Sequence, residues 1–210
     1  MDRFLIVGLG NPGREYAGSR HNIGFHCIDA LAHTHGLTFT RLQHKALITD
    51  GRIAGQRAVL AKPQTFMNRS GQSVGALMRF YKLPIENLIV VHDDLDLPLG
   101  TLRLRKQGGA GGQRGMRDII NHLGTNTFAR VRFGIGRPPG RMDPAAYVLQ
   151  QFDGDELPEV EAVTRRVVCA LETWLRDGID IAMTQHNGTG QPPATEAPPA
   201  SNGTDTNGAA

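Results

Sequence analysis

The stretch FLIVGLGNPGREYAGSRHNIGF, from Phe4 to Phe25, decides the fold of this chain. Its first four residues are all apolar, which is typical of a short strand buried on both faces of a sheet. A turn of glycine, asparagine and proline follows, and a polar loop then leads to His21 directly before a segment with helical spacing of apolar residues. Open α/β sheets build their sites in this way, beyond the carboxyl ends of their strands. The stretch therefore predicts an α/β fold with His21 at its functional edge.

Strands and helices alternate through the rest of the chain. Apolar periodicity and turn residues predict the following strands: 46–50 and 57–62 as a hairpin, 88–91, an exposed strand at 102–105, and 130–136. Helices are predicted after His21 as far as Gly36, before Pro84, after the glycines at 108–112, and from Asp155, a natural N-cap, to Gly178. This order predicts one α/β domain at residues 1–184, a mixed, mostly parallel twisted sheet flanked by helices, with an antiparallel hairpin at its margin. Residues 185–210 are almost devoid of hydrophobic residues beyond alanine and are predicted to be a disordered tail.

Composition narrows the class of protein. No run in the 210 residues approaches the roughly 20 apolar residues of a membrane span, and the first residues lack the apolar region of a signal peptide. The two cysteines, Cys27 and Cys169, have neither metal-ligand spacing nor a disulfide framework around them. We therefore expect free thiols, a cytoplasmic location and no membrane partner.

The charges are segregated along the chain although the net charge is only +3. Between residues 101 and 141 there are nine basic residues and one acid, whereas residues 142–180 carry nine acids and three arginines. A basic block this concentrated favours a polyanionic partner, because Lys and Arg displace counterions from phosphates. The alternative is a solvated charged face.

Four polar residues are predicted to converge in one crevice. Asn11, Asn68 and Asp93 each follow an apolar strand, and His21 enters from the loop after the first of them. A carboxylate that accepts one imidazole N–H fixes the tautomer of the histidine and supports its cation, so His21 and Asp93 would be a base and its orienting partner. Asn11 and Asn68 would donate hydrogen bonds to a carbonyl or an oxyanion. No serine or cysteine has a nucleophile's setting, so the predicted nucleophile is water.

Simpler interpretations stay open at this point. His21 and Asn68 could serve only at helix starts, and Asp93 could belong to a carboxylate metal site, although no further ligands stand at a helical spacing. Gly8, Gly10 and Gly13 formally match a dinucleotide fingerprint, but no helix is predicted where that motif needs one. The glycines at 108–112 are either an anion cradle at a helix start, or a flexible lid or a place of tight packing.

Taken together, the motifs resemble the bacterial-type peptidyl-tRNA hydrolase family. Five segments carry this resemblance in order and spacing: LIVGLGNPGREYAGSRHNIGF, KPQTFMNRSGQSV, IVVHDDLDLPLG, GGAGGQRGMRDII and FARVRFGIGRP. The resemblance implies a monomeric esterase that needs no metal or other cofactor and cuts the ester between a peptide and the 3′-terminal ribose of tRNA. Such an enzyme returns tRNA to translation after premature release of peptidyl-tRNA.

The resemblance also implies roles for individual residues. His21 matches the general base, Asp93 its carboxylate, and Asn11 the position that separates N-blocked substrates from free aminoacyl-tRNA. Further positions match the groove for the peptide and the tRNA acceptor end, namely Tyr16, Phe66 and Asn68, or the basic tRNA-facing surface, namely Arg103, Arg105 and Arg132.

One segment departs from the family pattern. Where the family usually has Gly-His-Asn-Gly, this chain has Gly112-Gln113-Arg114-Gly115. Arg114 is expected to bind substrate in place of an asparagine, but a guanidinium is bulkier and cannot accept a hydrogen bond. The rival function is a non-catalytic RNA-binding protein on the same fold. The joint presence of His21, Asp93, Asn11 and Asn68 favours the enzyme, because binding alone requires no base and carboxylate.

Overall fold

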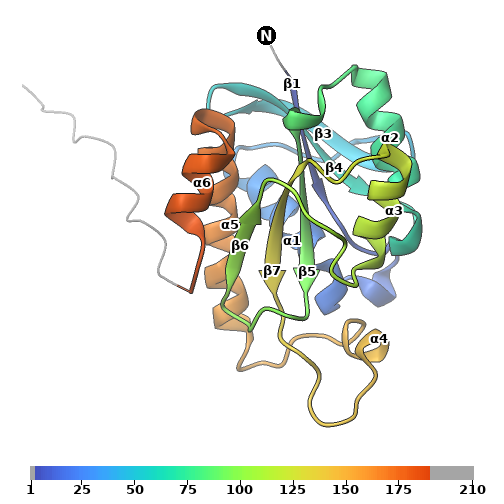
Figure 1. Ribbon diagram of the computed structural model, residues 1–210, viewed down its shortest axis with the longest axis vertical. Coiled ribbons are helices and arrows are strands. Elements are labelled where there is room, and N and C mark those ends of the chain that lie inside the picture. Colours follow the sequence, from blue (N-terminus) through green and yellow to red (C-terminus); the bar gives the residue numbers. More distant parts are fainter. Residues whose placement is uncertain (1–2, 190–210) are drawn as a thin grey trace, which may run out of the picture.

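Seven strands form one twisted sheet with helices on both of its faces (Figure 1). The computed structural model describes residues 3–189. The strands are β1 (Arg3–Gly8), β2 (Arg41–Gln43), β3 (Ala46–Ile53), β4 (Gln56–Pro63), β5 (Leu88–Asp94), β6 (Leu102–Arg105) and β7 (Ala129–Gly134). Their order across the sheet is β2-β3-β4-β1-β5-β7-β6. The single α/β domain predicted from the sequence is confirmed.

The sheet is parallel at its centre and antiparallel at both margins. β4, β1, β5 and β7 run parallel to one another, β2 and β3 extend one margin as antiparallel strands, and β6 lies antiparallel to β7 at the other margin. The sequence predicted only the first of these margins. All four parallel strands therefore deliver the loops that follow them to the same end of the sheet.

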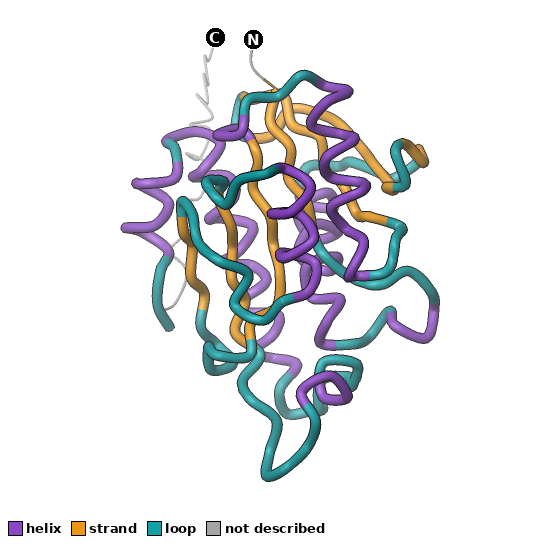
Figure 2. The backbone as a smooth tube through the Cα atoms, turned by 45° about the vertical axis from the view of Figure 1, so that its right-hand side comes forward, coloured by secondary structure: helices purple, strands orange, loops and turns teal. Residues whose placement is uncertain are grey.

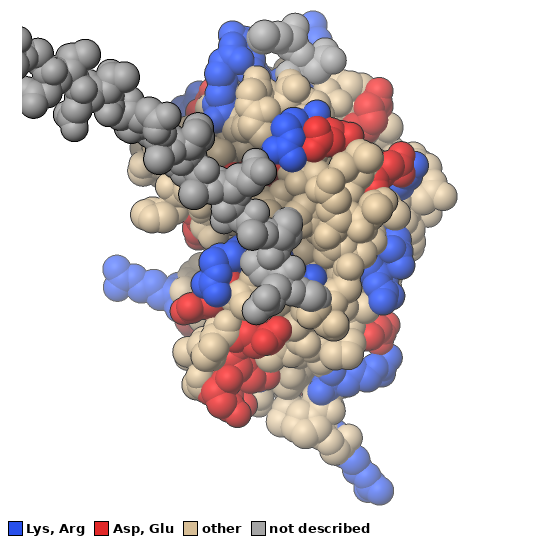
Figure 3. Space-filling model, turned by 90° about the vertical axis from the view of Figure 1, so that its left-hand side faces the viewer, with Lys and Arg blue, Asp and Glu red and all other residues tan. Residues whose placement is uncertain are grey.

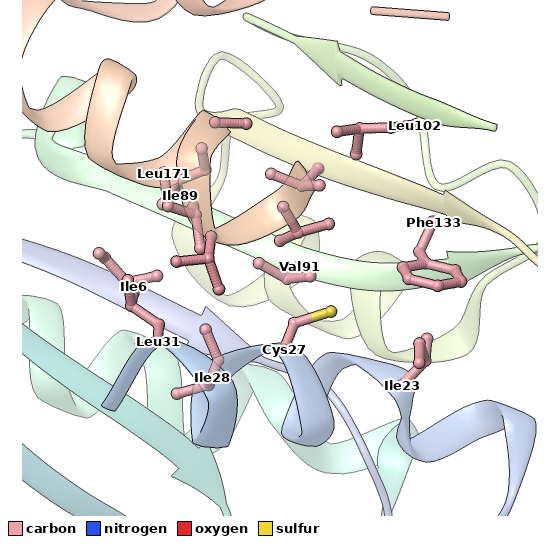
Figure 4. Packing of buried hydrophobic residues seen from close by; sticks show 14 of the residues in the cluster. Ile6, Ile23, Cys27, Ile28, Leu31, Ile89, Val91, Leu102, Phe133 and Leu171 are labelled. Carbon is pink, nitrogen blue, oxygen red and sulfur yellow. The ribbon is translucent and has the colours of Figure 1, made fainter. Parts of the chain in front are cut away.

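Two hydrophobic clusters cover the two faces. The helices are α1 (Ile23–Thr34), α2 (Ser70–Tyr81), α3 (Arg114–Leu123), α4 (Pro144–Tyr147), α5 (Leu157–Asp177) and α6 (Ile179–His186). Side chains of α1, α5 and α6 pack on one face, and those of α2 and α3 pack on the other. Figure 4 shows the first cluster, in which α1 and α5 meet the central strands through Ile6, Ile23, Cys27, Ile28, Leu31, Ile89, Val91 and Leu171. Burial raises the pKa of the Cys27 thiol to about 12, so this cysteine is an inert packing residue.

Two glycines let α1 lie directly against the end of β1. A Cβ added to Gly8 would stand 2.2 Å from the carbonyl oxygen of Gly24, and one added to Gly24 would stand 2.4 Å from the amide nitrogen of Leu9. This close approach sets the depth at which the loop between β1 and α1 enters the site. Only a three-residue 3₁₀ helix, Arg14–Tyr16, starts directly after Gly13, and α1 begins only at Ile23. No α-helix therefore starts at the glycines after β1, and the dinucleotide interpretation fails.

Three details of the sequence prediction were wrong. β6 is not an exposed strand: Leu102 and Leu104 are fully buried, and only the alternate side chains reach solvent. The N-cap of α5 is Glu156 rather than Asp155. The predicted boundary between residues 184 and 185 falls inside α6, and the next two residues pair with β6 through Asn187 Oδ1, which accepts from Leu104 N–H, and through Gly188, which exchanges backbone hydrogen bonds with Leu102. The remainder of the predicted tail, from residue 190, lies outside the described residues.

Among the described helices, none is both long and apolar enough to cross a bilayer.

Candidate active site

A cavity of about 780 Å³ opens at the carboxyl ends of the parallel strands. Loops gather at this end of the sheet, the lower end in Figure 2. The cavity is lined by Asn11, His21, Phe66, Met67, Asn68, Arg69, Asp93, Asp94, Leu95, Gly111, Gly112, Gln113, Arg114, Asp143, Pro144, Ala145, Val148 and Leu149. The four residues that the sequence predicted to converge are all among them.

His21 and Asp93 form a hydrogen-bonded pair in this cavity. The distance from His21 Nδ1 to Asp93 Oδ2 is 2.7 Å, and the side chain of Asp93 is only 3% exposed. An ionised carboxylate at Oδ2 requires the proton on Nδ1, so Nε2 is the basic nitrogen of the ring. His21 itself is 12% exposed, which leaves its ring accessible from the cavity.

Asn11 is held by a neighbouring asparagine that the sequence analysis passed over. The Asn22 side chain accepts a hydrogen bond from the backbone N–H of Asn11 at 2.8 Å and donates one to the carbonyl of Asn11 at 2.9 Å. The Oδ1 atom of Asn11 accepts from Met67 N–H at 2.8 Å. With Oδ1 engaged in this way, the NH₂ group of Asn11 is left as a donor toward the cavity. Asn22 directly follows His21, but nothing in its spacing signals this role.

Asn68 and Phe66 stand on the other side of the cavity, in and before a short 3₁₀ helix at Met67–Arg69. Both are exposed, and α2 begins after Arg69 without a side-chain cap, so Asn68 is not a helix cap. Tyr16 lies outside the residues that line the cavity, and its ring meets that of Phe66 edge to face at 6.5 Å. Tyr16 therefore contacts Phe66, which lines the cavity, but does not line the cavity itself.

Gln113 contacts the pair of His21 and Asp93 directly, which could not be anticipated from the sequence. Its Nε2 lies 3.2 Å from Asp93 Oδ1, and its Oε1 accepts from Met116 N–H at 2.7 Å as the N-cap of α3. The sequence departs from the family pattern at this position, but the role predicted for the departure was assigned to Arg114. In the structure Arg114 is exposed and lines the cavity, without a salt bridge to any residue between 3 and 189.

The glycine-rich loop before α3 is anchored by the buried Arg130. Its Nη1 donates to the carbonyl oxygens of Gly108 and Gly109, its Nη2 donates to those of Asn126 and Phe128, and its Nε also donates to that of Phe128. Gly111 and Gly112 have positive φ values of 55° and 81°, and a Cβ at either would meet nothing within 4 Å. These two glycines thus serve backbone conformation, not close packing, at the rim of the cavity.

Arg20 links the loop that carries His21 to one wall of the cavity, the wall that includes Val148 and Leu149. Its guanidinium pairs with both carboxylate oxygens of Glu156, at 2.9 and 2.6 Å, and lies over the rings of Tyr147 and Phe152. The backbone N–H groups of Arg20 and His21 donate to Gln150 and Val148, whose segment forms that wall. The position of the wall and that of His21 are thereby coupled.

The three predicted tRNA-facing arginines lie apart from the cavity, on β6 and β7. Arg103 lies opposite Arg132, and Arg105 opposite Arg130, so all four share one face of the sheet. The leucines of β6 pack on the α5 side of the sheet, so the arginines lie on the opposite face, which carries α3. Figure 1 shows β6 and β7 beside α3 on this face. Arg132 is partly engaged, since its Nε donates to Asp94 Oδ2 at 2.6 Å. Burial lowers the pKa of Arg105, and the charges of Arg103 and Arg132 add to this shift.

The far side of the molecule has a different charge pattern. Figure 3 shows basic and acidic side chains interspersed on the side of α5 and α6, with a group of acidic side chains in its lower part. The acids between residues 142 and 180 do not all lie on this side: Asp143 lines the cavity, and Asp180 pairs with Lys106, which directly follows the arginine face formed by Arg103, Arg105 and Arg132. Between residues 3 and 189, no three His, Cys, Asp or Glu side chains are placed to hold a metal ion.

Comparison with known proteins places the chain in a family. The profile described as peptidyl-tRNA hydrolase matches residues 5–194. A peptidyl-tRNA hydrolase of Chloroflexus aurantiacus is 52% identical over 185 residues, which are 88% of this chain and 98% of that protein. One from Alkaliphilus metalliredigens is 49% identical over 185 residues, 88% of this chain and all of that protein. The crystal structure of the Acinetobacter baumannii peptidyl-tRNA hydrolase superimposes with a TM-score of 0.82 at 38% identity, covering 88% of this chain and 94% of that one.

These similarities extend over nearly all of the described fold, and a solved structure of the family shares its architecture. They favour the enzyme over the rival interpretation of a non-catalytic RNA-binding protein. The chain therefore belongs to the peptidyl-tRNA hydrolase family and is an enzyme that hydrolyses peptidyl-tRNA.

Proposed function

We propose that His21 is the general base for hydrolysis of the ester between the peptide and the 3′-terminal ribose of tRNA. The observation that carries this proposal is the 2.7 Å bond from His21 Nδ1 to the buried carboxylate of Asp93, inside the cavity. Asp93 holds the ring in one tautomer and supports the positive charge that forms during the reaction. A base that acts in this way contributes about 10²–10⁴ in rate.

The reaction proceeds in two steps. His21 Nε2 takes a proton from water while the water oxygen bonds to the ester carbonyl carbon, which gives a tetrahedral oxyanion. The bond from that carbon to the ribose oxygen then breaks, and the imidazolium returns its proton to the ribose oxygen. Donors on Asn11 and Asn68 stabilise the oxyanion, each contributing about 10²–10³ where such donors have been measured.

The fixed orientation of Asn11 supports selection of N-blocked substrates. Because Met67 N–H occupies Oδ1, the side chain offers only its NH₂ group. A blocked amine brings a carbonyl that can accept from this group, whereas a free α-ammonium brings only donors. Phe66 and Leu149, which are 55% and 46% exposed on opposite parts of the lining, provide apolar surface for the peptide.

The arginine face and Arg114 are assigned to the tRNA. Arg103, Arg105 and Arg132 bind phosphates of the acceptor end, and Arg114 at the cavity rim meets the terminal nucleotide. The enzyme acts as a monomer in the cytoplasm and uses neither a metal ion nor another cofactor in this scheme. Burial lowers the pKa of Arg105, and the charges of Arg103 and Arg132 lower it further; a bound phosphate would relieve this repulsion, which supports a polyanionic partner.

One experiment tests this assignment. The protein is given N-acetyl-aminoacyl-tRNA and the same aminoacyl-tRNA without the acetyl group, and release of tRNA is followed. We expect hydrolysis of the blocked ester only, loss of turnover in His21→Ala, and tRNA binding close to that of the wild type. The matched control is His33→Ala, which removes an exposed histidine of α1 outside the cavity and should leave turnover unchanged. Equal loss of turnover and binding in His21→Ala would contradict a role as base.

A further inference from the structure

We infer that Gln113 is a positioning residue for the catalytic carboxylate, an inference that rests on the proposed role of His21 and Asp93. Gln113 takes no direct part in the reaction of the substrate. Its side chain fixes the carboxylate that in turn fixes the base.

Both oxygens of the Asp93 carboxylate have a donor. Oδ2 receives the proton of His21 Nδ1 at 2.7 Å, and Oδ1 receives a proton of Gln113 Nε2 at 3.2 Å. Asp93 is buried, so an oxygen without a donor would carry the full cost of desolvation. Two donors on two oxygens also prevent the carboxyl group from rotating about its terminal bond. The direction of the bond to His21 is set as a result.

The amide of Gln113 cannot turn over. Its Oε1 caps α3 by accepting Met116 N–H at 2.7 Å, and a reversed amide would place the NH₂ group against that N–H. Nε2 therefore has to point to Asp93, where it also lies 3.1 Å from the sulfur of Met67. Space is tight here as well, since a Cβ added to Gly115 would stand 2.6 Å from that sulfur and 3.1 Å from Oε1.

This arrangement connects α3 to both halves of the site. Gln113 touches the base pair through Asp93, and it touches Met67, whose N–H orients Asn11. Loss of the Gln113 donor should therefore slow the chemical step and leave substrate binding unchanged.

Gln113→Asn separates the two functions of the side chain. Asparagine is among the best N-cap residues, so α3 keeps its cap, but the side chain is one methylene shorter and loses its reach to Asp93. We expect kcat to fall between about tenfold and a hundredfold, the effect of one hydrogen bond to a charged group. KM should stay within about twofold of the wild-type value, and the Tm should not change.

Gln113→His is the conservative rescue. A histidine ring presents an N–H on one side and an acceptor nitrogen on the other, so it can donate to Asp93 and still cap α3. We expect its kcat to lie within about threefold of the wild type.

Three outcomes would overturn the inference: a wild-type kcat in Gln113→Asn, a loss of kcat that comes with a lower Tm, or a Gln113→His enzyme as slow as Gln113→Asn. The parallel measurement on His21→Ala separates the two proposals. If His21→Ala is inactive while Gln113→Asn is normal, only the role of Gln113 falls. If His21→Ala keeps its turnover, the proposed base falls.

Discussion

Two adjacent side chains, Arg20 and His21, show how single residues divide the work at this site. His21 turns to Asp93 and the cavity, whereas Arg20 turns to Glu156 and holds the wall in place. Arg20 is 3% exposed and Glu156 is 22% exposed, so the pair is largely shielded from solvent. The hydrogen bond from Arg20 is the main cause that lowers the pKa of Glu156 below 4.5.

Glu156→Gln should destabilise the protein in a pH-dependent way. Because the folded-state pKa is below the unfolded value, the ionised carboxylate stabilises the fold above about pH 4.5, and this contribution is lost as pH falls through the lower folded-state pKa. We expect the free energy of unfolding to drop by about 3 kcal/mol at pH 7, since the variant leaves the charge of Arg20 unpaired. Urea unfolding at pH 7 and at lower pH measures the difference, which should shrink in acid.

The control is Glu161→Gln, whose carboxylate is 74% exposed and pairs with Arg165 at 3.9 Å on the surface of α5. This change should cost less than about 0.5 kcal/mol. An equal, pH-independent loss of unfolding free energy in both variants would show that the Arg20–Glu156 pair stabilises the fold no more than a surface ion pair does.

Some residues of the site could be predicted from the sequence, whereas others could not, for a physical reason. Asn11 and Asp93 could be predicted because each follows an apolar run in the sequence, and parallel strands end at a common edge; in the structure Asp93 is the last residue but one of β5. The pair of Arg20 with Glu156 joins residues 136 positions apart, and the bond from Gln113 to Asp93 joins α3 to β5. No local pattern records such pairings, because they depend on how helices and loops settle on the sheet.

At the level of elements, the contact between β1 and α1 sets the geometry of the site. Gly8→Ala should lower the free energy of unfolding by about 1–3 kcal/mol, because its Cβ would overlap the carbonyl of Gly24. It should also lower kcat, since the displaced strand end carries Asn11. Gly154→Ala is the matched control, because a Cβ there meets nothing within 4 Å. Thermal unfolding and turnover assays on both variants test this, and equal stability of the two would contradict it.

Most helices and strands were predictable from the sequence, and the exceptions are those whose periodicity is masked or too short to detect. The strands at the centre and the helices after His21 and before Pro84 follow apolar periodicity and turn residues. β6 was taken for an exposed strand because the arginines between its leucines conceal a half-buried alternation. α4 has four residues and β2 three, lengths too short for any periodicity to appear.

Over the whole molecule, the basic block of the sequence forms an arginine face on β6 and β7, whereas acids of the following block are spread out, with Asp143 at the cavity and Asp180 paired with Lys106. The arginine face is built by two antiparallel strands that place Arg103 opposite Arg132, and the carboxylate of Asp94, which accepts from Arg132 Nε, offsets part of the repulsion between these like charges. The sequence could predict the excess of basic residues between 101 and 141, but it could not distinguish Arg130, which is buried under a loop, from the solvent-facing arginines.

The double variant Arg103→Ala/Arg105→Ala should weaken tRNA binding and reduce its dependence on salt. Each lost phosphate contact lowers the slope of log affinity against log salt concentration by about 1, so the slope should fall by about 2. At saturating tRNA the kcat should stay near the wild-type value. Equilibrium binding at several salt concentrations measures the slope. Arg165→Ala, on the surface of α5, is the control and should leave it unchanged. An unaltered slope in the double variant would contradict the proposal that Arg103 and Arg105 bind tRNA phosphates.

The clasp that Asn187 and Gly188 form on β6 has a consequence for how the molecule behaves in concentrated solution. An outermost strand with open amide and carbonyl groups is a template for sheet-to-sheet aggregation between copies. By hydrogen-bonding Leu102 and Leu104 on their outward side, the clasp blocks self-association next to the arginines that we propose bind tRNA.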